Sequence, residues 1–565
     1  MARPARRFPG WLLHYDRGDL SSDAAAGLTV AVMLVPQGMA YAMLAGLPPV
    51  AGLYASVIPL AVYALLGSSR HLAVGPVALI SLLTLAACSR LAPPGSPEYV
   101  PLVLLLALMV GVIQLAAGLL RFGFLINFFS QAVIGGFTAA AALVIALSQV
   151  QHVSGVPAGG GSSFFELVRD IVGRAGEIHA PTLALGIASI AGMVALRKRY
   201  PRLPSAILFV VAGSLLAWAW GGLGIETVGE VPRGLPPLSL PSLNPLAIQE
   251  LFLDALAIVF VSFMESISVA KYMAAKAGYK VDPNRELVGL GAANLAASFF
   301  SGYPVTGGFS RTAVNYQAGA RTQLASLITS GFVLLTLLFL TPLFHHLPKA
   351  VLGAVIIVAV VDLIDVRQAV YLFRVKKSDG AVFLVTFLCT LGVGLDRGLL
   401  IGMVFSLGLF IWRSSHPHTA ELGYLQSEGV FRNVDRYPEA KRNPEVLILR
   451  PDASLFFANM KFLEDRLARD LAGRPGVKLI LLDLSGVNDI DAVSIDELEE
   501  LMEAYVHQEI RFAFAGMKGP VRDLVARAGW EAKYGESYQY PSIPHALAAF
   551  GYARDGGSPG PTPES

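Results

Sequence analysis

Long runs of apolar residues, separated by short segments rich in polar residues, glycine and proline, fill most of the sequence from residue 23 to residue 413. A helix needs about 20 predominantly apolar residues to cross a bilayer. The pattern predicts fourteen helical spans, several of them shorter than a straight crossing needs. They lie near residues 23–45, 50–67, 75–89, 100–120, 125–149, 180–196, 204–221, 248–275, 286–301, 308–318, 323–342, 348–364, 380–395 and 398–412. The chain is therefore expected to be an α-helical, polytopic membrane protein.

The pattern changes after Arg413. Residues 414–443 are polar and rich in turn-forming residues, so we predict a linker there. Beyond it, strand-like runs at 446–449, 477–484 and 512–515 alternate with helical stretches at 457–471 and 491–505, which is typical of an α/β domain with a covered sheet. We expect this domain to span residues 444–553 and residues 554–565 to form a disordered tail.

Composition supports a membrane location. The 565 residues are 54% hydrophobic and only 15% charged, which is too apolar for an ordinary soluble protein. Lys and Arg gather in the connections on the same side as residues 1–22, so both termini are expected to be cytoplasmic. The net charge of +2, without a clustered basic run, does not indicate nucleic-acid binding. Cys88 and Cys389 lie in apolar stretches, so no disulfide or metal site is indicated.

Seven spans followed by seven more would form two repeats, at about 23–221 and 248–412, which are inverted because each has an odd number of spans. The third and tenth spans then correspond. Both are short and follow an extended stretch with glycine or proline, at Gly75, Pro76 and Val77 in the first half and at 305–309 in the second. Paired interrupted segments of this kind predict a transporter binding site near the bilayer midplane.

Two charges stand out in the second half, Glu265 and Arg311. An ionisable group inside apolar sequence is expensive and indicates a functional site. Ser262, Glu265 and Ser268 are three residues apart and share one side of a helix, whereas Asp254 is better explained as an outer-end residue that reaches water. Arg311 follows a glycine-rich entry into a short helix, where unpaired N–H groups add positive charge. The pocket should therefore select an anion.

A further set of short motifs resembles the SulP, or sulfate permease, family of anion transporters. They are PQGMAYA at 36–42, GLPPVAGLY at 46–54, GSSRH at 67–71, VGPVA at 74–78, ESIS at 265–268 and TGGFSRTAVN at 306–315. The run LDLSGVNDID at 482–491 resembles the loop of a STAS domain, which SulP members carry at their C-terminus. Phosphorylated relatives have Ser or Thr two residues after this loop's last aspartate, but here Val493 stands there.

The resemblance implies an inverted repeat of seven plus seven spans, with a mobile core domain that moves against a gate domain. It implies that Gln37 and Tyr41 belong to the anion pocket, that Ser310 and Arg311 contact the anion, and that Glu265 is linked to proton coupling. Together with the interrupted segments, the predicted substrate-binding set is Gln37, Tyr41, Gly75, Pro76, Val77, Gly308, Phe309, Ser310 and Arg311, with no metal ligand. A homodimer with contacts through the STAS domain is also expected.

We therefore predict a secondary active anion transporter of the plasma (inner) membrane that takes up sulfate with protons by alternating access. Bicarbonate or a dicarboxylate such as fumarate or succinate, carried by symport or exchange, stays open as substrate, and sodium stays open as the coupling ion. An uncoupled, channel-like protein would not need Glu265. An enzyme is not indicated, because no nucleophile–base pair or metal constellation is present. Glu265 and Arg311 also have a purely structural interpretation, as a pair that holds a broken helix.

Overall fold

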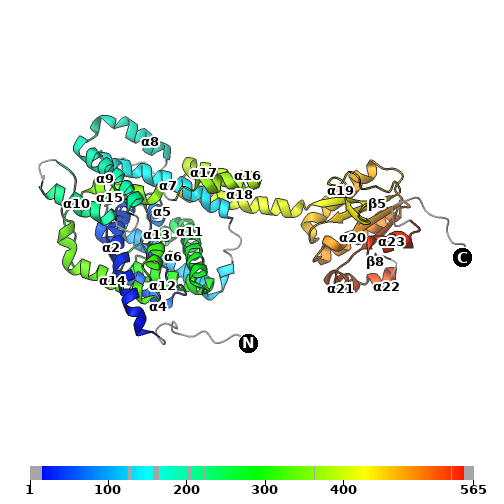
Figure 1. Cartoon of the computed structure of the whole chain (residues 1–565), viewed down its shortest axis with the longest axis horizontal. Coiled ribbons are helices and arrows are strands. Elements are labelled where there is room, and N and C mark those ends of the chain that lie inside the picture. The colour runs from blue at the N-terminus through cyan, green and yellow to red at the C-terminus, as the bar shows by residue number, and fades with distance from the viewer. Residues whose placement is uncertain are drawn as a thin grey trace. The chain divides into compact units, whose positions relative to one another are not determined.

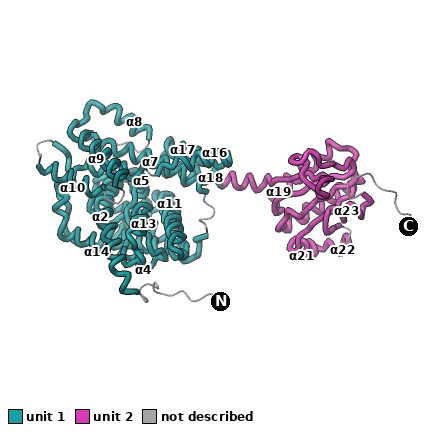
Figure 2. Tube along the Cα trace, in the orientation of Figure 1, with its two compact units in different colours: residues 1–406 teal, residues 407–565 magenta. Residues whose placement is uncertain are grey.

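The computed structural model describes residues 15–124, 130–156, 164–200, 205–219, 224–361, 363–535 and 538–552. The chain divides into two compact units, residues 1–406 and 407–565 (Figure 2). The predicted N-terminal segment is described only from residue 15 onward, and the predicted tail at 554–565 lies outside the described residues.

The first unit is helical (Figure 1), as the apolar runs predict. Each of the fourteen predicted stretches contains a helix. The helices are α2 (Leu20–Leu44), α3 (Pro49–Tyr54), α4 (Ile58–Leu66), α5 (Ala78–Cys88), α6 (Tyr99–Leu119), α7 (Gln131–Ser154), α9 (Ala180–Arg199), α10 (Ser205–Ala219), α11 (Pro245–Ala277), α12 (Pro283–Phe299), α13 (Phe309–Gln317), α14 (Leu324–Leu335), α15 (Lys349–Val361), α17 (Lys377–Val393) and α18 (Leu395–Ser415). Among the described residues, eight helical stretches are long and apolar enough to cross a membrane, so fourteen crossings stay a prediction.

The stretch predicted as one span at 50–67 is broken into α3 and α4. Here α3 packs very closely on α2, because a Cβ atom at Gly52 would lie only 1.8 Å from the carbonyl oxygen of Gly38. Pro59 then occupies the first turn of α4, where its missing N–H has no cost. Two amphipathic helices that the sequence did not predict, α8 (Phe164–Gly173) and α16 (Val366–Val375), join the longer ones.

Two short strands join the halves of the first unit. Strand β1 (Val74–Gly75) pairs antiparallel with β2 (Thr306–Gly307), with Val74 opposite Gly307 and Gly75 opposite Thr306. Helix α5 starts three residues after β1 ends, and α13 starts two residues after β2 ends. The two interrupted segments predicted to correspond therefore lie side by side and run in opposite directions.

Buried carboxylates tie the loops around these strands to distant helices. Glu286, on α12, accepts hydrogen bonds from the Tyr63 hydroxyl at 2.6 Å and from the backbone N–H groups of Ser68 and Ser69 at 2.7 and 3.0 Å. Asp23, on α2, accepts from the Thr322 hydroxyl at 2.6 Å and from the Arg321 N–H at 2.7 Å. Both acids are fully buried, and each joins a segment of the first predicted repeat to one of the second.

The second unit is an α/β domain around one six-stranded sheet, ordered β4-β3-β5-β6-β7-β8. The strands are β3 (Thr419–Leu425), β4 (Val430–Asn433), β5 (Val446–Pro451), β6 (Leu479–Asp483), β7 (Arg511–Ala515) and β8 (Gln539–Tyr540), and the helices are α19 (Phe457–Ala472), α20 (Ala492–Val506), α21 (Gly519–Arg527), α22 (Trp530–Tyr534) and α23 (Ile543–Ala549). Strands β5 to β8 are parallel, and β3 is antiparallel to both of its neighbours. The alternation predicted from the sequence produces this parallel part.

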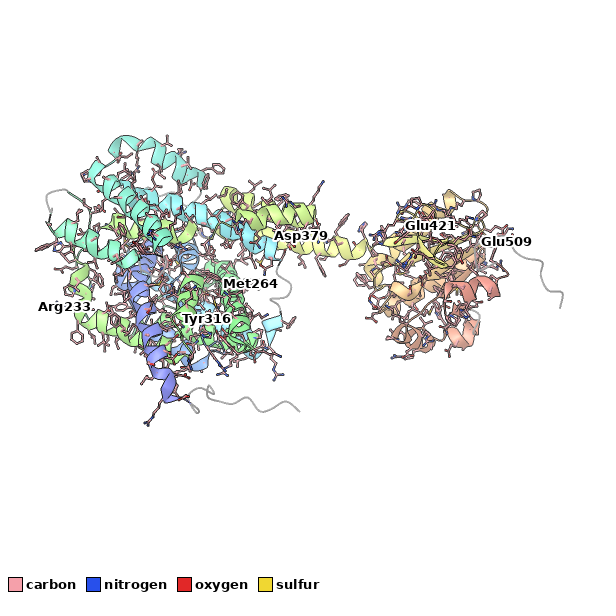
Figure 3. All side chains as sticks on the ribbon, in the orientation of Figure 1. Arg233, Met264, Tyr316, Asp379, Glu421 and Glu509 are labelled. Atoms are coloured by element: carbon pink, nitrogen blue, oxygen red, sulfur yellow. The ribbon has the colours of Figure 1, made fainter. Side chains whose placement is uncertain are left out.

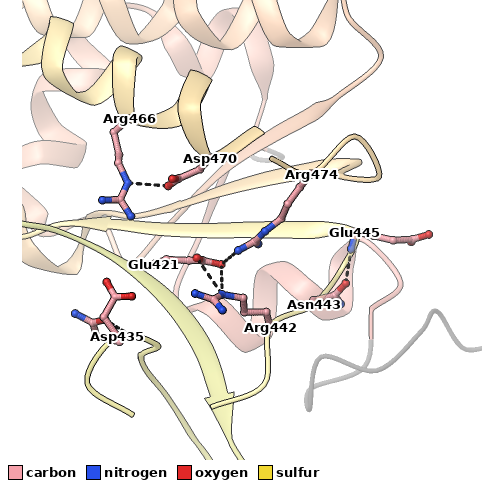
Figure 4. Close-up of polar contacts among 9 residues, drawn as sticks. Glu421, Asp435, Arg442, Asn443, Glu445, Arg466, Asp470 and Arg474 are labelled. Atoms are coloured by element: carbon pink, nitrogen blue, oxygen red, sulfur yellow. Dashed lines mark hydrogen bonds and ion pairs between the residues drawn. The ribbon is translucent and has the colours of Figure 1, made fainter. Parts of the chain in front are cut away.

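The prediction that residues 414–443 form a linker is wrong, because β3 and β4 lie there and pair with each other, and β3 also pairs with β5. The misleading signal was the polar content of this segment. Glu421, buried on β3, is held between Arg442, whose Nε lies 3.1 Å from the carboxylate, and Arg474 (Figure 4). An ion-paired glutamate therefore occupies a position where strand patterning expects an apolar side chain.

Candidate functional site

Arg311 lies in the first turn of α13, directly after the paired strands. Its side chain is only 2% exposed. Nη1 donates a hydrogen bond to the carbonyl oxygen of Pro76 at 2.7 Å, while Nε and Nη2 are buried and have no partner among the described residues. A buried donor without a partner is costly. The guanidinium group is thus held by one bond and presents two unused donors.

Glycines leave space around this guanidinium group. A Cβ atom at Gly308 would lie 2.9 Å from Arg311 Nη2, and one at Gly75 would lie 3.5 Å from the same atom. A side chain at Gly308 would therefore push against the group, whereas glycine lets the backbone of both interrupted segments come close to it. The predicted residues Gly75, Pro76, Gly308 and Arg311 are brought together here.

Two helices start at this place. The residues that precede α5 and α13, Val77 and Gly308, give no side-chain cap to the first turn. The first N–H groups of a helix have no partner inside it and carry about half a positive charge. Because β1 and β2 hold these helix starts close together, their partial charges add to the full charge of Arg311. The region is electropositive and suited to an anion.

Glu265 lies on α11 and directly follows Met264, which Figure 3 labels. One carboxylate oxygen, Oε2, is buried and has no hydrogen-bond partner among the described residues. The ionisable groups close enough to act on the charge of Arg311 are Tyr41, Glu265 and Tyr303. Within the part of the chain that the structure describes, no ion pair joins Glu265 to Arg311. This conformation therefore does not support the purely structural interpretation, in which Glu265 and Arg311 form a tight ion pair.

Gln37 and Tyr41, four residues apart on α2, are both buried. Gln37 Oε1 has no partner in the described residues, and Tyr41 interacts electrostatically with both Arg311 and Glu265. Phe309 and Ser310 have exposed side chains, and the Phe309 ring packs 6.3 Å from the ring of Tyr272. The structure therefore does not bring these two predicted side chains to the buried guanidinium group, and only their N–H groups belong to the uncapped start of α13.

The sequence analysis missed the polar frame that positions β2. Asn294, on α12, donates to Gln114 Oε1 at 2.9 Å and to the Val305 carbonyl at 3.1 Å, and its Oδ1 accepts from the Val305 N–H at 2.7 Å. Gln114 Nε2 in turn donates to the Ser262 hydroxyl at 2.6 Å. The only signal in the sequence was an amide side chain inside two apolar stretches.

Serine and threonine complete the frame on the other side of β2. The Ser266 hydroxyl lies 2.7 Å from the Thr306 hydroxyl and accepts from the Gly307 N–H at 2.8 Å. The Thr306 hydroxyl also donates to the Ser262 carbonyl at 2.7 Å. Ser266 adjoins Glu265, so this contact fixes the carboxylate-bearing turn of α11 against the interrupted segment.

Asp254 does not reach water as expected, and that prediction is wrong. Its side chain is buried and forms an ion pair with Arg90, which follows α5. An acid whose charge is stabilised by an ion pair is a poor carrier of a moving proton, because protonation would abolish that ion pair. Glu265 is therefore the better candidate for coupling.

Comparison with known proteins gives these features a family. Residues 20–386 match the sulfate permease family, and residues 437–538 match the STAS domain. The chain belongs to the sulfate permease family. It is 39% identical over 543 residues to sulfate transporter 4.1, chloroplastic, of Arabidopsis thaliana, covering 93% of this chain and 79% of that one. It is 36% identical over 539 residues to a probable sulfate transporter of Mycobacterium tuberculosis, covering 95% and 96%.

Solved structures support the fold. The murine Slc26a9 anion transporter in the inward-facing state matches with a TM-score of 0.88 and 26% identity, over 95% of this chain and 93% of that one. The transmembrane domain of a cyanobacterium bicarbonate transporter, BicA, matches with a TM-score of 0.61 and 22% identity, over 70% and 98%, which shows a shared fold. The predicted family and the helical transporter fold with a STAS domain are confirmed. The prediction of a transporter rather than an enzyme is confirmed as well, because the family and its relatives are transporters: the chain is a multi-pass membrane transporter.

Proposed function

We propose that this protein is a secondary active transporter that takes up sulfate with protons across the inner (plasma) membrane by alternating access. The observation that carries the proposal is Arg311, a buried guanidinium group with two unused donors at the meeting point of two uncapped helices. The planar fork of arginine matches two oxygens of an oxyanion. The relatives named as sulfate transporters make sulfate the first choice.

Glu265 supplies the proposed coupling. Burial disfavours the charged form of the Glu265 carboxylate, and the attraction of the nearby Arg311 charge opposes this effect while the site is empty. When an anion neutralises Arg311, that attraction is lost and proton uptake by Glu265 becomes easier. Linkage then requires the reverse as well, so a protonated Glu265 favours anion binding. The unpaired Oε2 of Glu265 offers a place for the proton.

Charge sets the stoichiometry that sulfate needs. Moving one net negative charge inward against 100 mV costs about 2.3 kcal/mol, and one proton moving down a one-unit pH gradient returns about 1.4 kcal/mol. Sulfate with one proton still carries a net negative charge, so its accumulation requires a second proton or an exchanged anion. Bicarbonate with one proton would be electroneutral.

Bicarbonate is therefore the second candidate substrate. The observation that favours it is the pairing of Asp254 with Arg90, which leaves Glu265 as the single convincing coupling acid of the candidate site. The fold shared with a bicarbonate transporter fits the same idea. A dicarboxylate such as fumarate or succinate would match two donors on Arg311 equally well but would need the same charge compensation as sulfate.

The test is uptake of labelled sulfate, bicarbonate and succinate into proteoliposomes, with a proton gradient, a sodium gradient or neither. The parent protein should accumulate sulfate only with the proton gradient. Glu265→Gln should bind and exchange sulfate but lose gradient-driven accumulation. Glu226→Gln is the matched control, because Glu226 is exposed and pairs only with Lys349, and it should behave as the parent.

Three results would count against the proposal. Accumulation by Glu265→Gln that still follows the proton gradient would remove Glu265 from coupling. A sodium requirement would replace the proton. Selective uptake of bicarbonate without sulfate transport would leave the mechanism in place and change the substrate.

A further inference from the structure

Helix α16 (Val366–Val375) presents an unusual surface. None of its residues is buried, and four large apolar side chains are at least half exposed: Val366, Val370, Tyr371 and Val375. The side chain of Tyr371, for example, is 62% exposed. Exposed apolar side chains gathered on one side of a helix are unfavourable in water and mark a surface that meets another apolar phase.

The helix is nevertheless firmly placed. Asp365 caps its start, because its carboxylate accepts a hydrogen bond from the Gln368 N–H at 2.9 Å. The ring of Phe373 packs against α17, where a Cβ atom at Gly380 would lie 2.5 Å from the ring. Gln368 reaches α7, with Oε1 lying 3.3 Å from a Cβ atom built at Gly135. The exposed face is therefore held in one orientation by packing on α7 and α17.

Two basic side chains lie in the middle of that face, between the exposed valines at 366 and 370 and the exposed apolar residues at 371 and 375. Val366, Arg367, Val370, Tyr371 and Arg374 line a shallow hollow of about 280 Å³. Arg367 and Arg374 are seven residues apart, so they lie on the same side of the helix, about 10 Å apart along its axis. Neither makes an ion pair with another of the described residues.

The surrounding charge has the same sign. Between residues 365 and 379 there are four basic residues, Arg367, Arg374, Lys376 and Lys377, against two acidic ones, Asp365 and Asp379. By the positive-inside bias, this connection lies on the cytoplasmic side of the membrane. The cytoplasmic leaflet carries the anionic lipids that attract such segments.

We propose that α16 lies in the interface of the inner leaflet and that its Arg367–Arg374 face binds the phosphate headgroup of an anionic phospholipid. The exposed valines then reach the boundary with the acyl chains, as in other interfacial helices. Tyr371 lies at the level of the headgroups, where its ring contacts apolar lipid and its hydroxyl contacts polar groups. The two guanidinium groups, with apolar side chains on either side of them, hold the phosphate by charge-assisted hydrogen bonds.

The experiment uses the full-length Tyr371→Trp variant in vesicles of phosphatidylcholine. Energy transfer from the new tryptophan to dansyl-phosphatidylglycerol or dansyl-phosphatidylcholine measures which lipid gathers at α16, after subtraction of the parent signal. We expect phosphatidylglycerol to be preferred. Adding Arg367→Gln and Arg374→Gln should reduce the preference about 25-fold, because each basic residue contributes about a fivefold effect.

The matched control removes two other basic residues at a helix end, with Lys198→Gln and Arg199→Gln, which follow the apolar part of α9. These changes should leave the preference at α16 unaltered. An equal loss in the control would reduce the effect to general surface charge and overturn the proposal. No preference between the two lipids at the introduced tryptophan, or a tryptophan signal that vanishes because a second copy or another protein covers α16, would overturn it as well.

Discussion

Replacing Arg311 by alanine tests the electrostatics of the candidate site directly. The change removes the two unused donors, Nε and Nη2, and the single bond to Pro76. A hydrogen bond to a charged group contributes about 1.5–3 kcal/mol, so the loss of two such bonds to the anion costs at least about 3 kcal/mol. The affinity for sulfate should therefore fall by at least about 100-fold.

The anion-free protein should respond differently. Because Arg311 is buried with two unpaired donors, alanine removes an unfavourable group as well as one hydrogen bond, and the stability of the empty protein should change little. Binding to the folded state stabilises a protein by about 2.7 kcal/mol at one hundred times the dissociation constant. At that same sulfate concentration a variant with 100-fold weaker binding would gain only about 0.4 kcal/mol.

The assay is thermal unfolding of the purified protein in detergent at increasing sulfate concentration. The parent should show a clear rise in Tm with sulfate, Arg311→Ala almost none, and Arg311→Lys an intermediate rise, because lysine keeps the charge but loses the planar fork. Arg321→Ala is the control, since Arg321 is exposed and its side chain makes only a surface ion pair with Asp19. A full sulfate-dependent rise in Arg311→Ala would refute the assignment.

Two further predictions concern the frame and the STAS domain. Asn294→Ala leaves buried partners at Gln114 and Val305 unpaired, so it should lower the stability of the empty protein by about 1–3 kcal/mol and weaken sulfate binding; an unchanged Tm would contradict this. Partial burial alone would raise the pKa of Asp491, but N–H bonds from Ser494 and Phe457 hold that pKa below its ordinary value. The cap therefore stabilises α20 fully at neutral pH and loses its effect as pH falls below about 4. Asp491→Ala should speed amide exchange in α20 at pH 7, because it lowers the free energy of opening that helix by about 1 kcal/mol. The difference in exchange between the variant and the parent should shrink in acid.

The apolar pattern predicted where helices lie because burial and hydropathy agree along most of the first unit. It did not predict the break between α3 and α4, since that break accompanies the contact of Gly52 with Gly38, which depends on packing between separate helices. The sequence did not predict helices α8 and α16, because their polar halves lower the average hydropathy. In the second unit, the sequence did not predict β3 and β4, because a glutamate such as Glu421, which is buried and ion-paired here, is more typical of a loop.

The candidate site was predictable to the extent that it contains charges. Glu265 and Arg311 are conspicuous because a charge inside apolar sequence is expensive, and the interrupted segments at Gly75 and Gly308 are conspicuous because glycine breaks a helix. The frame of Gln114 and Asn294 was not predictable, since one neutral amide in an apolar helix is common and its partner lies far away in the sequence. Only the tertiary structure pairs such groups.

The difference between the frame and the site has a physical consequence. Neutral donors and acceptors bind the frame together. The buried acids elsewhere in the first unit, Asp23 and Glu286, also accept several hydrogen bonds from hydroxyl and N–H groups. The charge of Arg311, by contrast, has no close acidic partner among the described residues. A frame that is already satisfied gains nothing from an anion, whereas Arg311 gains two hydrogen bonds and a counter-charge. We therefore expect the binding energy of the anion to be concentrated on one residue at the junction of the two predicted repeats. A small movement between the repeats would change access to the anion most at this place.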